Sequence, residues 1–346
     1  MDIKTCKSVV IERPRQANFR EIELAPRQPD SIIAKTVLSG ISAGTDMKTW
    51  RGEQHPDKLF YPCVPGYENV GVIVEEGSWA PHLKKGDRVM INEVRKFGNV
   101  CSAWGGNMHY AIKDKTSAGG NDGMAKIPDN VTDADAVLAY LAGVALKGVY
   151  KAPIKDGDRV LVVGAGMVGL GAIQSVKIMF PKATVCCIER HPMRCEVAKL
   201  FADHVILADG NEVQQYNDYT NGKRADVILE CSGNPAVPGT LHKFLKDGGW
   251  SRDSIGGHIH LQGDYPEKLI FDDYHRWFGK NCTISMTCAI YFECKTTILQ
   301  WMTEGKFKTK GIPFEVWPVG KCAEAYDYFD KKKGDVFKVL FDWSNV

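Results

Sequence analysis

The chain has 346 residues, of which 44% are hydrophobic and 25% are charged. These proportions are typical of a globular protein and exclude a disordered chain. Its 44 lysines and arginines nearly balance 42 aspartates and glutamates, so the net charge is only +2. That balance gives no electrostatic reason to expect a nucleic acid or an anionic membrane as a partner. The length favours two domains.

The cysteines predict a reduced protein without a disulfide framework. There are 11 of them, an odd number, and no two form a Cys-x-x-Cys pair. The first 16 residues lack the apolar core of a secretory signal, and no run of about 18 apolar residues occurs that would span a membrane. We therefore expect a cytoplasmic protein without membrane contact.

Short strand-type runs dominate the first 120 residues. They cover 8–13, 31–40, 69–77 and 87–94, and each is bounded by glycine, proline or charged residues. Their close spacing predicts a barrel or folded sheet. Near residue 133 the pattern changes, and apolar residues at helical spacing predict a helix over 133–152 that stops at Pro153.

From residue 158 onward, apolar strands alternate with helices. Strands are predicted at 158–166, 183–189, 204–208, 225–233 and 256–263, and helices at 167–179, 191–202 and 240–247. This alternation indicates an α/β domain whose parallel sheet is covered on both faces. The tail returns to mixed character, with helices predicted at 295–305 and 320–333 and a strand at 336–343.

A glycine-rich motif joins the first of these strands to the first helix. It reads Gly164-Ala165-Gly166-Met167-Val168-Gly169, the pattern G-x-G-x-x-G. Glycines at these positions allow a tight turn and bring a pyrophosphate close to the N–H groups of the helix start at Met167 and Val168. Glu189 ends the next strand, where an acceptor for a ribose hydroxyl belongs. The motif predicts a dinucleotide cofactor, and a ligand-free glycine turn is the alternative.

Two residues at the end of the second strand, Glu189 and Arg190, indicate which dinucleotide binds. Glu189 favours NAD, because its carboxylate would repel the 2′-phosphate of NADP. Arg190 comes next in the chain, and its guanidinium could reach such a phosphate instead. The sequence favours NAD and leaves the role of Arg190 open.

With these motifs in place, the chain resembles the medium-chain dehydrogenase/reductases, the superfamily of zinc alcohol, sorbitol and threonine dehydrogenases. The resemblance is carried by 39–52, 65–77, 84–89, 104–112, 155–169, 225–235 and 305–308. The forms SGISAGTD and PGYE are most similar to the branch of the bacteriochlorophyllide side-chain alcohol dehydrogenases.

The resemblance implies an α/β fold in three segments. They are a GroES-like, strand-rich catalytic domain over 1–140, a Rossmann domain with a doubly wound parallel sheet over 141–290, and a C-terminal segment over 291–346 that returns to the first domain. It also implies that Ser232 and Gln262 contact the NAD.

The chain departs from this family at the metal sites. Where a zinc enzyme carries a cysteine ligand, this sequence has Ser42 and Ala43 in a segment that is one residue longer, and neither supplies a thiolate. Where the family carries a histidine ligand, this sequence has Tyr67. The third ligand position falls near Ala139, and the lobe of the structural zinc retains a single cysteine, Cys101. Zinc needs three or four Cys, His or carboxylate ligands, and only Glu68 survives. We therefore expect no zinc.

Without zinc, a side chain must handle the hydroxyl proton of an alcohol substrate. Tyr67 stands at a metal-ligand position, but a phenol with a pKa of about 10 needs a nearby cation to act at neutral pH. Lys48 is the candidate for that cation, and Thr45 matches the family's hydroxyl that binds the substrate. Two alternatives stay open: Tyr67 fills the vacated space, and Lys48 is solvated or pairs with Asp46.

Other polar residues are candidates for the surroundings of the substrate. Glu68 is expected to pair with a lysine or arginine rather than to carry protons. The remaining candidates near the substrate are Ser42, Trp104 and His109, of which Trp104 is equally a packing residue. A polar substrate of the polyol, sugar or cyclitol type is suggested by Lys48, Tyr67, Glu68, Asn92, Glu93 and Arg95.

The sequence thus predicts a zinc-independent, NAD-dependent oxidoreductase that transfers a hydride between nicotinamide and a secondary alcohol or ketone. Two alternatives remain: an enzyme that retains NAD and oxidises its substrate only transiently, as an epimerase or lyase does, and a retired member that binds nucleotide without catalysis. The apolar run 282–290 is expected to be an exposed sheet edge that joins chains into a homodimer or homotetramer. The insertion at 250–257 is expected to be a surface loop. A lid and an oligomer contact are the alternatives.

Overall fold

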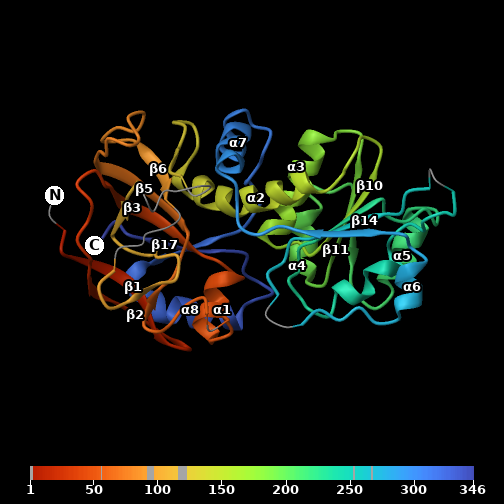
Figure 1. The fold of residues 1–346 in the computed structure, drawn as a ribbon, viewed down its shortest axis with the longest axis horizontal. Helices are drawn as coiled ribbons and strands as arrows, with labels where there is room; N and C mark the ends of the chain where they lie inside the picture. Colours follow the sequence, from red (N-terminus) through yellow and green to blue (C-terminus); the bar gives the residue numbers. More distant parts are fainter. Residues whose placement is uncertain (1–2, 56, 92–96, 116–122, 252–253, 266–267) are drawn as a thin grey trace. The chain divides into compact units, whose positions relative to one another are not determined.

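A computed structural model describes residues 3–55, 57–91, 97–115, 123–251, 254–265 and 268–346. The chain divides into two compact units (Figure 1). Unit 1 comprises Met1–Tyr140, Tyr291–Gly305 and Ile312–Val346, and unit 2 comprises Leu141–Ile290 and Lys306–Gly311. Among the described residues, no helix is long and apolar enough to cross a membrane.

Unit 2 is built on a parallel sheet. Its described strands are β10 (Arg159–Val163), β11 (Thr184–Glu189), β12 (His204–Leu207), β13 (Val227–Glu230), β14 (His258–Leu261) and β15 (Thr283–Met286). They lie in the order β12-β11-β10-β13-β14-β15, and each neighbouring pair is parallel. The strand order reverses beside β10, which is the first of these strands in the chain. This is the doubly wound arrangement predicted from the sequence.

Helices cover the strands of this sheet. The helices of unit 2 are α3 (Met167–Met179), α4 (Pro192–Ala198), α5 (Glu212–Tyr219), the 3₁₀ helix η1 (Pro238–Lys243) and α6 (Tyr274–Phe278). α3 packs on β10 and β11, and α4 packs on β11 and β12. The core between these layers contains Leu161, Ile188, Ile228 and Ile259. Continuous apolar strands suit a sheet that is buried on both faces.

The helix predicted over 240–247 forms only in part. The chain forms only the 3₁₀ helix η1 there, and Leu245 then makes a parallel bridge with Ala225. Ala225 N–H donates to the Phe244 carbonyl oxygen, and Lys246 N–H donates to the Ala225 carbonyl oxygen. These bonds hold 244–246 in extended pairing, so the backbone groups that a helix would need are already occupied.

Unit 1 is rich in strands, as predicted. One sheet has the order β2-β1-β4-β7, with β1 (Thr5–Arg13), β2 (Gln16–Glu23), β4 (Cys63–Val64) and β7 (Cys101–Ser102). The other has the order β16-β17-β3-β5-β6-β9, with β8 paired to β3. Its strands are β3 (Ile32–Ile41), β5 (Glu68–Glu75), β6 (Arg88–Ile91), β8 (Tyr110–Lys113), β9 (Ala125–Lys126), β16 (Glu315–Pro318) and β17 (Val339–Asp342).

The last part of the chain completes unit 1. β17 pairs antiparallel with β3, so that Val339 lies opposite Ile41, and β16 pairs in parallel with β17. The helices are α1 (Thr45–Arg51), α2 (Asp133–Lys151), α7 (Phe292–Thr303), η2 (Val319–Lys321) and α8 (Cys322–Lys331). α2 begins in unit 1 and ends in unit 2.

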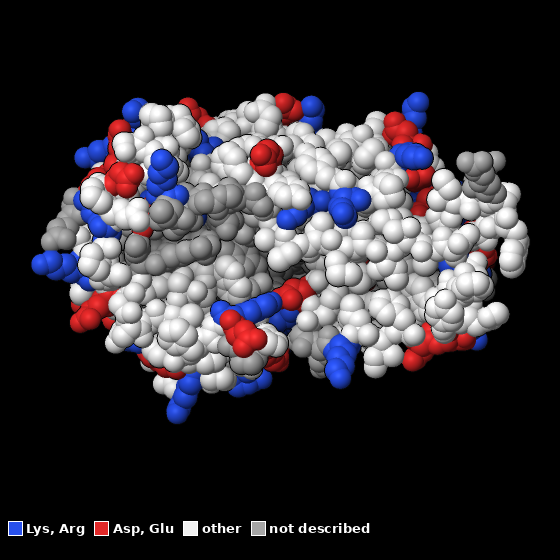
Figure 2. Space-filling view, viewed as in Figure 1, with Lys and Arg blue, Asp and Glu red and all other residues white. Residues whose placement is uncertain are grey.

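Charged side chains are mixed on the surface. On the face drawn in Figure 2, lysines and arginines lie among aspartates and glutamates without a broad field of one sign. This distribution agrees with the net charge of +2.

Candidate active site and nucleotide cradle

Three hydroxyl groups meet in unit 1 where the chain passes from β3 into α1. The Tyr67 hydroxyl oxygen lies 2.5 Å from Ser42 Oγ and donates a 3.3 Å hydrogen bond to Thr45 Oγ1. Ser42 follows β3 directly, Thr45 begins α1, and Tyr67 precedes β5. Ser42 Oγ also accepts the Thr45 N–H at 3.3 Å. Ser42, Thr45 and Tyr67, which the sequence analysis predicted to lie near the substrate, therefore form one hydrogen-bonded group. We call this group the hydroxyl cluster.

Aromatic rings pack around Tyr67. Trp104 meets its ring edge-on at a centroid distance of 6.1 Å, and Tyr140 of α2 lies against it at 4.7 Å. Aromatic pairs of this kind stabilise a site beyond the area that they bury. Trp104 has a φ of 70°, a conformation that costs energy for a residue with a side chain. The surrounding structure therefore imposes the position of Trp104 against Tyr67.

Asp46 anchors the two segments that carry the cluster. One carboxylate oxygen accepts the Ser42 N–H at 2.9 Å, and the other accepts the Gly66 N–H at 3.1 Å. The side chain is fully buried. Burial raises the pKa of Asp46 to about 7, because it disfavours the charged form more than these two bonds favour it. Asp46 therefore accounts for the geometry between Ser42 and Tyr67.

The surroundings of Tyr67 keep its phenol protonated. Burial is the largest cause that raises the pKa of Tyr67 above the usual value, and the Glu68 and Asp46 carboxylates add to it. The hydrogen bonds with Ser42 and Thr45 act in the opposite direction but are weaker. The expectation that a nearby cation lowers the pKa of Tyr67 is thus wrong, because carboxylates rather than an ammonium dominate its electrostatic surroundings. Tyr67 can donate and relay a proton but is a poor base at neutral pH.

Glu68 is held by a lysine from the far end of the chain. Lys338, which precedes β17, donates a hydrogen bond to Glu68 Oε1, and both side chains are about 1% exposed. A Cβ atom at Gly40 would lie 2.8 Å from Lys338 Cε, so the glycine makes room for the lysine. Burial raises the pKa of Glu68, while Lys338 lowers it. The bond to Lys338 is the pairing expected for Glu68.

The donor set of this site does not fit zinc. The sequence resemblance puts Ser42 or Ala43 at one family ligand position, Tyr67 at a second and Ala139 near the third, and none of these side chains is a thiolate, imidazole or carboxylate. Glu68 is already engaged by Lys338. In the described parts of the chain, no three His, Cys, Asp or Glu side chains converge in a way that could hold a metal ion. Zinc prefers thiolate, imidazole and carboxylate donors, none of which is free in the hydroxyl cluster.

The glycine-rich turn in unit 2 has the features of a nucleotide cradle. A Cβ at Gly169 would lie 1.9 Å from the Gly164 carbonyl oxygen, and one at Gly164 would lie 2.8 Å from Ser232 Cα. Close backbone packing therefore requires both glycines. A Cβ at Gly166 would meet nothing nearer than Arg194 Nη1 at 3.8 Å. The space above Gly166 is left open, as a ligand that approaches the backbone needs.

The start of α3 offers free N–H groups at this turn. Gly166 is the N-cap of the helix, and no side chain caps it. The N–H groups of Met167, Val168 and Gly169 therefore point from the helix N-terminus without a side-chain acceptor, which suits an anionic phosphate. The residues present fit the pyrophosphate of a dinucleotide.

Glu189 ties the second strand to the glycine-rich turn. Its Oε2 accepts the Ala165 N–H at 2.7 Å, and its Oε1 accepts the N–H groups of Arg190 and His191 at 2.8 and 2.9 Å. A carboxylate oxygen has two lone pairs, so Oε2 retains one for a ribose hydroxyl. Arg190 is exposed, and its Nε lies 3.1 Å from His191 Nε2.

Ser232 and Gln262 lie at the carboxyl ends of neighbouring strands. The Ser232 N–H and hydroxyl both donate to Glu230 Oε1, and Tyr265 donates to Glu230 Oε2. Gln262 follows β14 and bonds to α2 through the Val144 carbonyl oxygen. Ligands of doubly wound sheets bind at this edge.

The structure also places the predicted residues His109 and Lys48. The His109 ring lies tilted against the Tyr110 ring at a centroid distance of 4.4 Å, and the His109 backbone bonds to Lys7 and Thr36 on neighbouring strands. Lys48 is buried on α1, one turn after Thr45. Asn92, Glu93 and Arg95 lie outside the described residues.

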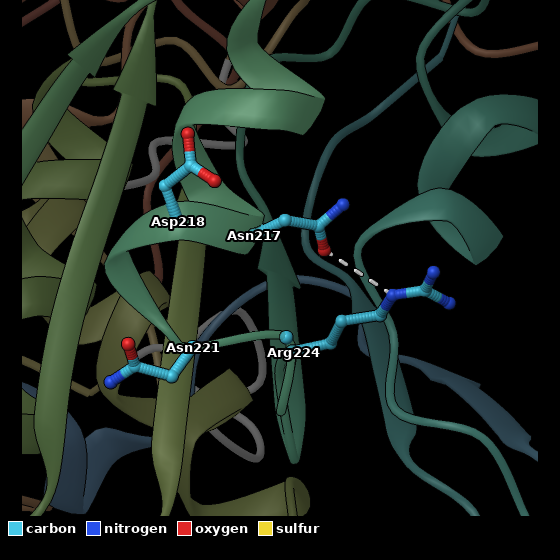
Figure 3. A pocket seen from close by; sticks show the side chains of 5 residues that line it. Asn217, Asp218, Asn221 and Arg224 are labelled. Atoms are coloured by element: carbon cyan, nitrogen blue, oxygen red, sulfur yellow. Dashed lines mark hydrogen bonds between the residues drawn. The ribbon is translucent and has the colours of Figure 1, made fainter.

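A surface hollow of about 430 Å³ lies elsewhere in unit 2, at the end of α5. Figure 3 shows Arg224 reaching toward Asn217, to which it donates a 3.4 Å bond. The Arg224 guanidinium also pairs with Asp247 at 3.6 Å. None of the sequence-predicted site residues lines this hollow.

Sequence reasoning missed Lys338 and Tyr140 as members of the site. Lys338 had a signal, because it interrupts the apolar run of 336–341 in a predicted strand. A lysine at an interior strand position requires a buried partner. No sequence signal identified Tyr140, because a single tyrosine in an apolar helix usually packs in a hydrophobic core.

The fold and these two sites define a class: a nucleotide-binding α/β unit joined to a strand-rich unit that carries a hydroxyl cluster. Comparison with known families agrees. Residues 28–133 match the alcohol dehydrogenase GroES-like domain, and residues 167–251 match the zinc-binding dehydrogenase domain.

Individual relatives match over most of the chain. The starvation-sensing protein RspB of Escherichia coli K12 is 31% identical over 98% of this chain and 99% of its own. A sorbitol dehydrogenase of Bacillus subtilis is 25% identical over 70% of this chain and 73% of its own. The solved structure of a short chain alcohol dehydrogenase (rspB) from E. coli CFT073 with cofactor NADH has a TM-score of 0.81 and 22% identity. That match covers 99% of this chain and 100% of the solved chain and shows the shared fold. The protein therefore belongs to the medium-chain dehydrogenase/reductase superfamily of alcohol dehydrogenases, which confirms the resemblance to that superfamily.

Proposed function

We propose that the protein is an NAD-dependent oxidoreductase that interconverts a secondary alcohol and a ketone without zinc. The observation that carries this proposal is the hydroxyl cluster, in which Tyr67, at the expected position of a metal ligand, bonds to both Ser42 and Thr45. Membership of an alcohol dehydrogenase superfamily supports the reaction class. The open space above Gly166 supports the nicotinamide dinucleotide.

The hydroxyl cluster supplies a path for the substrate proton. Thr45 binds the substrate oxygen, since its hydroxyl accepts from Tyr67 and so retains its own hydrogen to donate. When a ketone is reduced, Thr45 donates its proton to the new alkoxide, Tyr67 replaces that proton through their hydrogen bond, and Tyr67 recovers its own proton from Ser42. One proton taken up from solvent restores Ser42, so that all three hydroxyl groups end protonated. A bound nicotinamide would supply the hydride, and in alcohol oxidation the protons would move in the reverse direction and one would leave to solvent.

The cofactor and substrate classes follow from the polar groups of each site. Glu189 retains a lone pair for a ribose hydroxyl and would repel a 2′-phosphate, which supports NAD over NADP. The hydroxyl cluster and the aromatic walls of Trp104 and Tyr140 suit a substrate with several hydroxyl groups, because polar and apolar faces alternate on a sugar. A relative named sorbitol dehydrogenase supports a polyol or sugar.

The protein is also proposed to form a homo-oligomer through β15. That strand lies at the edge of the described sheet, and its Ile284 and Met286 side chains are exposed. An apolar edge with free backbone groups is a site for pairing with a second strand. An antiparallel copy of β15 would bury both side chains in a homodimer.

The deciding experiment is reduction of NAD by chelator-treated protein across polyols, sugars, cyclitols and simple secondary alcohols, with zinc measured in the same sample. Turnover without zinc supports the proposal and gives the substrate class. Stoichiometric zinc that turnover requires would contradict it. Silence across the panel with NAD released on unfolding would favour an enzyme that retains its cofactor, such as an epimerase or lyase. Silence without bound NAD would favour a retired nucleotide-binding member.

A further inference from the structure

A row of polar side chains runs along the last two strands of unit 2. His258, His260 and Gln262 occupy every second position along β14 and at its carboxyl end. Ser285 and Thr287 do the same along β15 and just beyond it. Side chains two residues apart on a strand share one face of the sheet. His258 and His260 are buried. This polar row, which we call the Gln262 chain, thus lies on a face where a parallel sheet normally carries apolar residues.

Hydrogen bonds connect every member of the Gln262 chain. Ser285 Oγ lies 2.7 Å from His258 Nε2 and 2.8 Å from His260 Nδ1. His260 Nε2 lies 3.1 Å from Thr287 Oγ1, and Thr287 Oγ1 donates to Gln262 Oε1 at 3.5 Å. Gln262 Nε2 donates to the Val144 carbonyl oxygen of α2 at 3.1 Å.

The donor and acceptor of each bond follow from the last acceptor in the series, the Val144 carbonyl oxygen. A carbonyl oxygen can only accept, so the NH₂ group of Gln262 faces Val144 and its oxygen faces Thr287. Thr287 therefore donates to Gln262 and accepts from His260 Nε2–H. His260 Nδ1 then accepts from Ser285, which accepts from His258 Nε2–H. His260 must be neutral for this order, because its Nδ1 accepts while its Nε2–H donates, and burial brings the pKa of His260 to about 4. Burial also lowers the pKa of His258, whose Nε2–H only donates.

A glycine in α2 makes room for the side chains of the Gln262 chain. A Cβ at Gly148 would lie 1.7 Å from Gln262 Oε1 and 3.0 Å from His260 Cδ2. Any side chain there would expel the Gln262 amide from its place against the helix. Gly148 lies in the interior of α2, where glycine costs about 1 kcal/mol relative to alanine. The close fit between the amide and the helix is a reason for glycine at that position.

We propose that the Gln262 chain positions the cofactor: it fixes the Gln262 amide so that the second Nε2–H, which does not bond to Val144, donates to the carboxamide oxygen of the nicotinamide. This inference rests on the proposed NAD-dependent function and adds a specific contact to it. Gln262 is half-buried at the carboxyl end of β14, the edge where such sheets bind ligands. Gln262 makes the contact, and Thr287, His260 and Ser285 act through it as positioning residues.

Binding of two ligands tests the proposal without measuring turnover. NADH and ADP-ribose share the adenosine and pyrophosphate, but ADP-ribose lacks the nicotinamide. We expect Gln262→Met and Thr287→Val to weaken NADH binding roughly 3- to 10-fold, the value of one hydrogen bond, and to leave the Kd of ADP-ribose unchanged. Thr287→Ser keeps the hydroxyl and should restore NADH binding. Thr283→Val is the matched control, because Thr283 lies on β15 but is not a member of the Gln262 chain.

The outcomes separate this inference from the proposed function. Equal NADH affinity in Thr287→Val and Thr283→Val would overturn the inference, and so would a parallel loss of both ligands, which a purely structural role produces. A wild-type protein that binds neither ligand would contradict the proposed function itself. If Gln262→Met does not fold, comparison of Thr287→Val with Thr287→Ser still decides the question, because these variants differ by a hydroxyl and a methyl group.

Discussion

Lys338 donates a hydrogen bond to Glu68 across 270 positions of the sequence, and neither side chain is more than about 1% exposed. This ion pair joins the C-terminal segment to the residue that follows Tyr67. Burial of two charges is tolerated only when each compensates the other. The pair therefore makes the geometry beside the hydroxyl cluster dependent on the last strand of unit 1.

Removal of one partner should be severe. We expect Lys338→Met to lower the free energy of unfolding by roughly 3–5 kcal/mol, because it leaves the Glu68 carboxylate buried without a counter-charge. Urea denaturation measures the loss. Lys331→Met is the control, since the Lys331–Asp327 pair is exposed and such pairs contribute at most about 1 kcal/mol. The double variant Lys338→Met/Glu68→Gln should recover much of the loss; equal effects of the Lys338 and Lys331 variants would contradict the role assigned to the pair.

Two glycines of the nucleotide turn should respond in opposite ways. Gly166→Ala should fold with stability within about 0.5 kcal/mol of the wild type, because its Cβ meets open space, but should lose NADH affinity at least about tenfold. Gly169→Ala should instead be destabilised, because its Cβ would lie 1.9 Å from the Gly164 carbonyl oxygen. Melting temperatures and NADH titrations distinguish the two. NADH affinity retained in Gly166→Ala would refute the cradle.

The sequence could predict the sheet and the cradle because both depend on local patterns. The alternation of apolar strands and helices gave the parallel order, and the glycine spacing located the turn beside Glu189. The interior of unit 1 depends on contacts between distant segments, such as Lys338 with Glu68, which no local pattern contains. The pKa of Tyr67 was predicted in the wrong direction for the same reason. Burial and the Asp46 and Glu68 carboxylates dominate it, and their proximity is a property of the folded chain.

The titration of Asp46 should be visible in the pH dependence of stability. Its pKa is 3.8 when unfolded and about 7 when folded. The folded state thus binds more protons than the unfolded state between about pH 4 and 7, so this group's contribution to the free energy of unfolding falls as pH rises through that window. A shift of about three units corresponds to about 4 kcal/mol.

The substitution Asp46→Asn isolates the contribution of Asp46 titration to the free energy of unfolding. We expect the free energy of unfolding of the wild type, relative to Asp46→Asn, to fall by up to about 4 kcal/mol between pH 4 and 8. Urea denaturation at each pH measures it, with the surface substitution Asp129→Asn as the background. A difference that does not vary with pH would show that Asp46 is ionised throughout.

The exposed edge of unit 2 predicts a change in mass. Ile284→Lys with Met286→Lys should convert a homo-oligomer into a monomer, because each ammonium would have to be desolvated against a partner strand. Light scattering coupled to size exclusion measures the mass. Ile255→Lys is the control, since Ile255 is also exposed but lies on the loop at the insertion. A wild-type monomer, or an oligomer that survives both lysines, would place the assembly elsewhere or exclude it.

Tyr67→Phe tests the hydroxyl cluster itself. Phenylalanine keeps the ring contacts with Trp104 and Tyr140 and removes only the hydroxyl that bonds to Ser42 and Thr45. We expect kcat to fall about 10²- to 10⁴-fold with little change in the affinity for NADH, because proton transfer, and not cofactor binding, loses a member. Tyr216→Phe, a buried tyrosine of unit 2, should leave kcat unchanged. Near-normal turnover in Tyr67→Phe would mean that Tyr67 only fills the space where other members of the superfamily bind zinc.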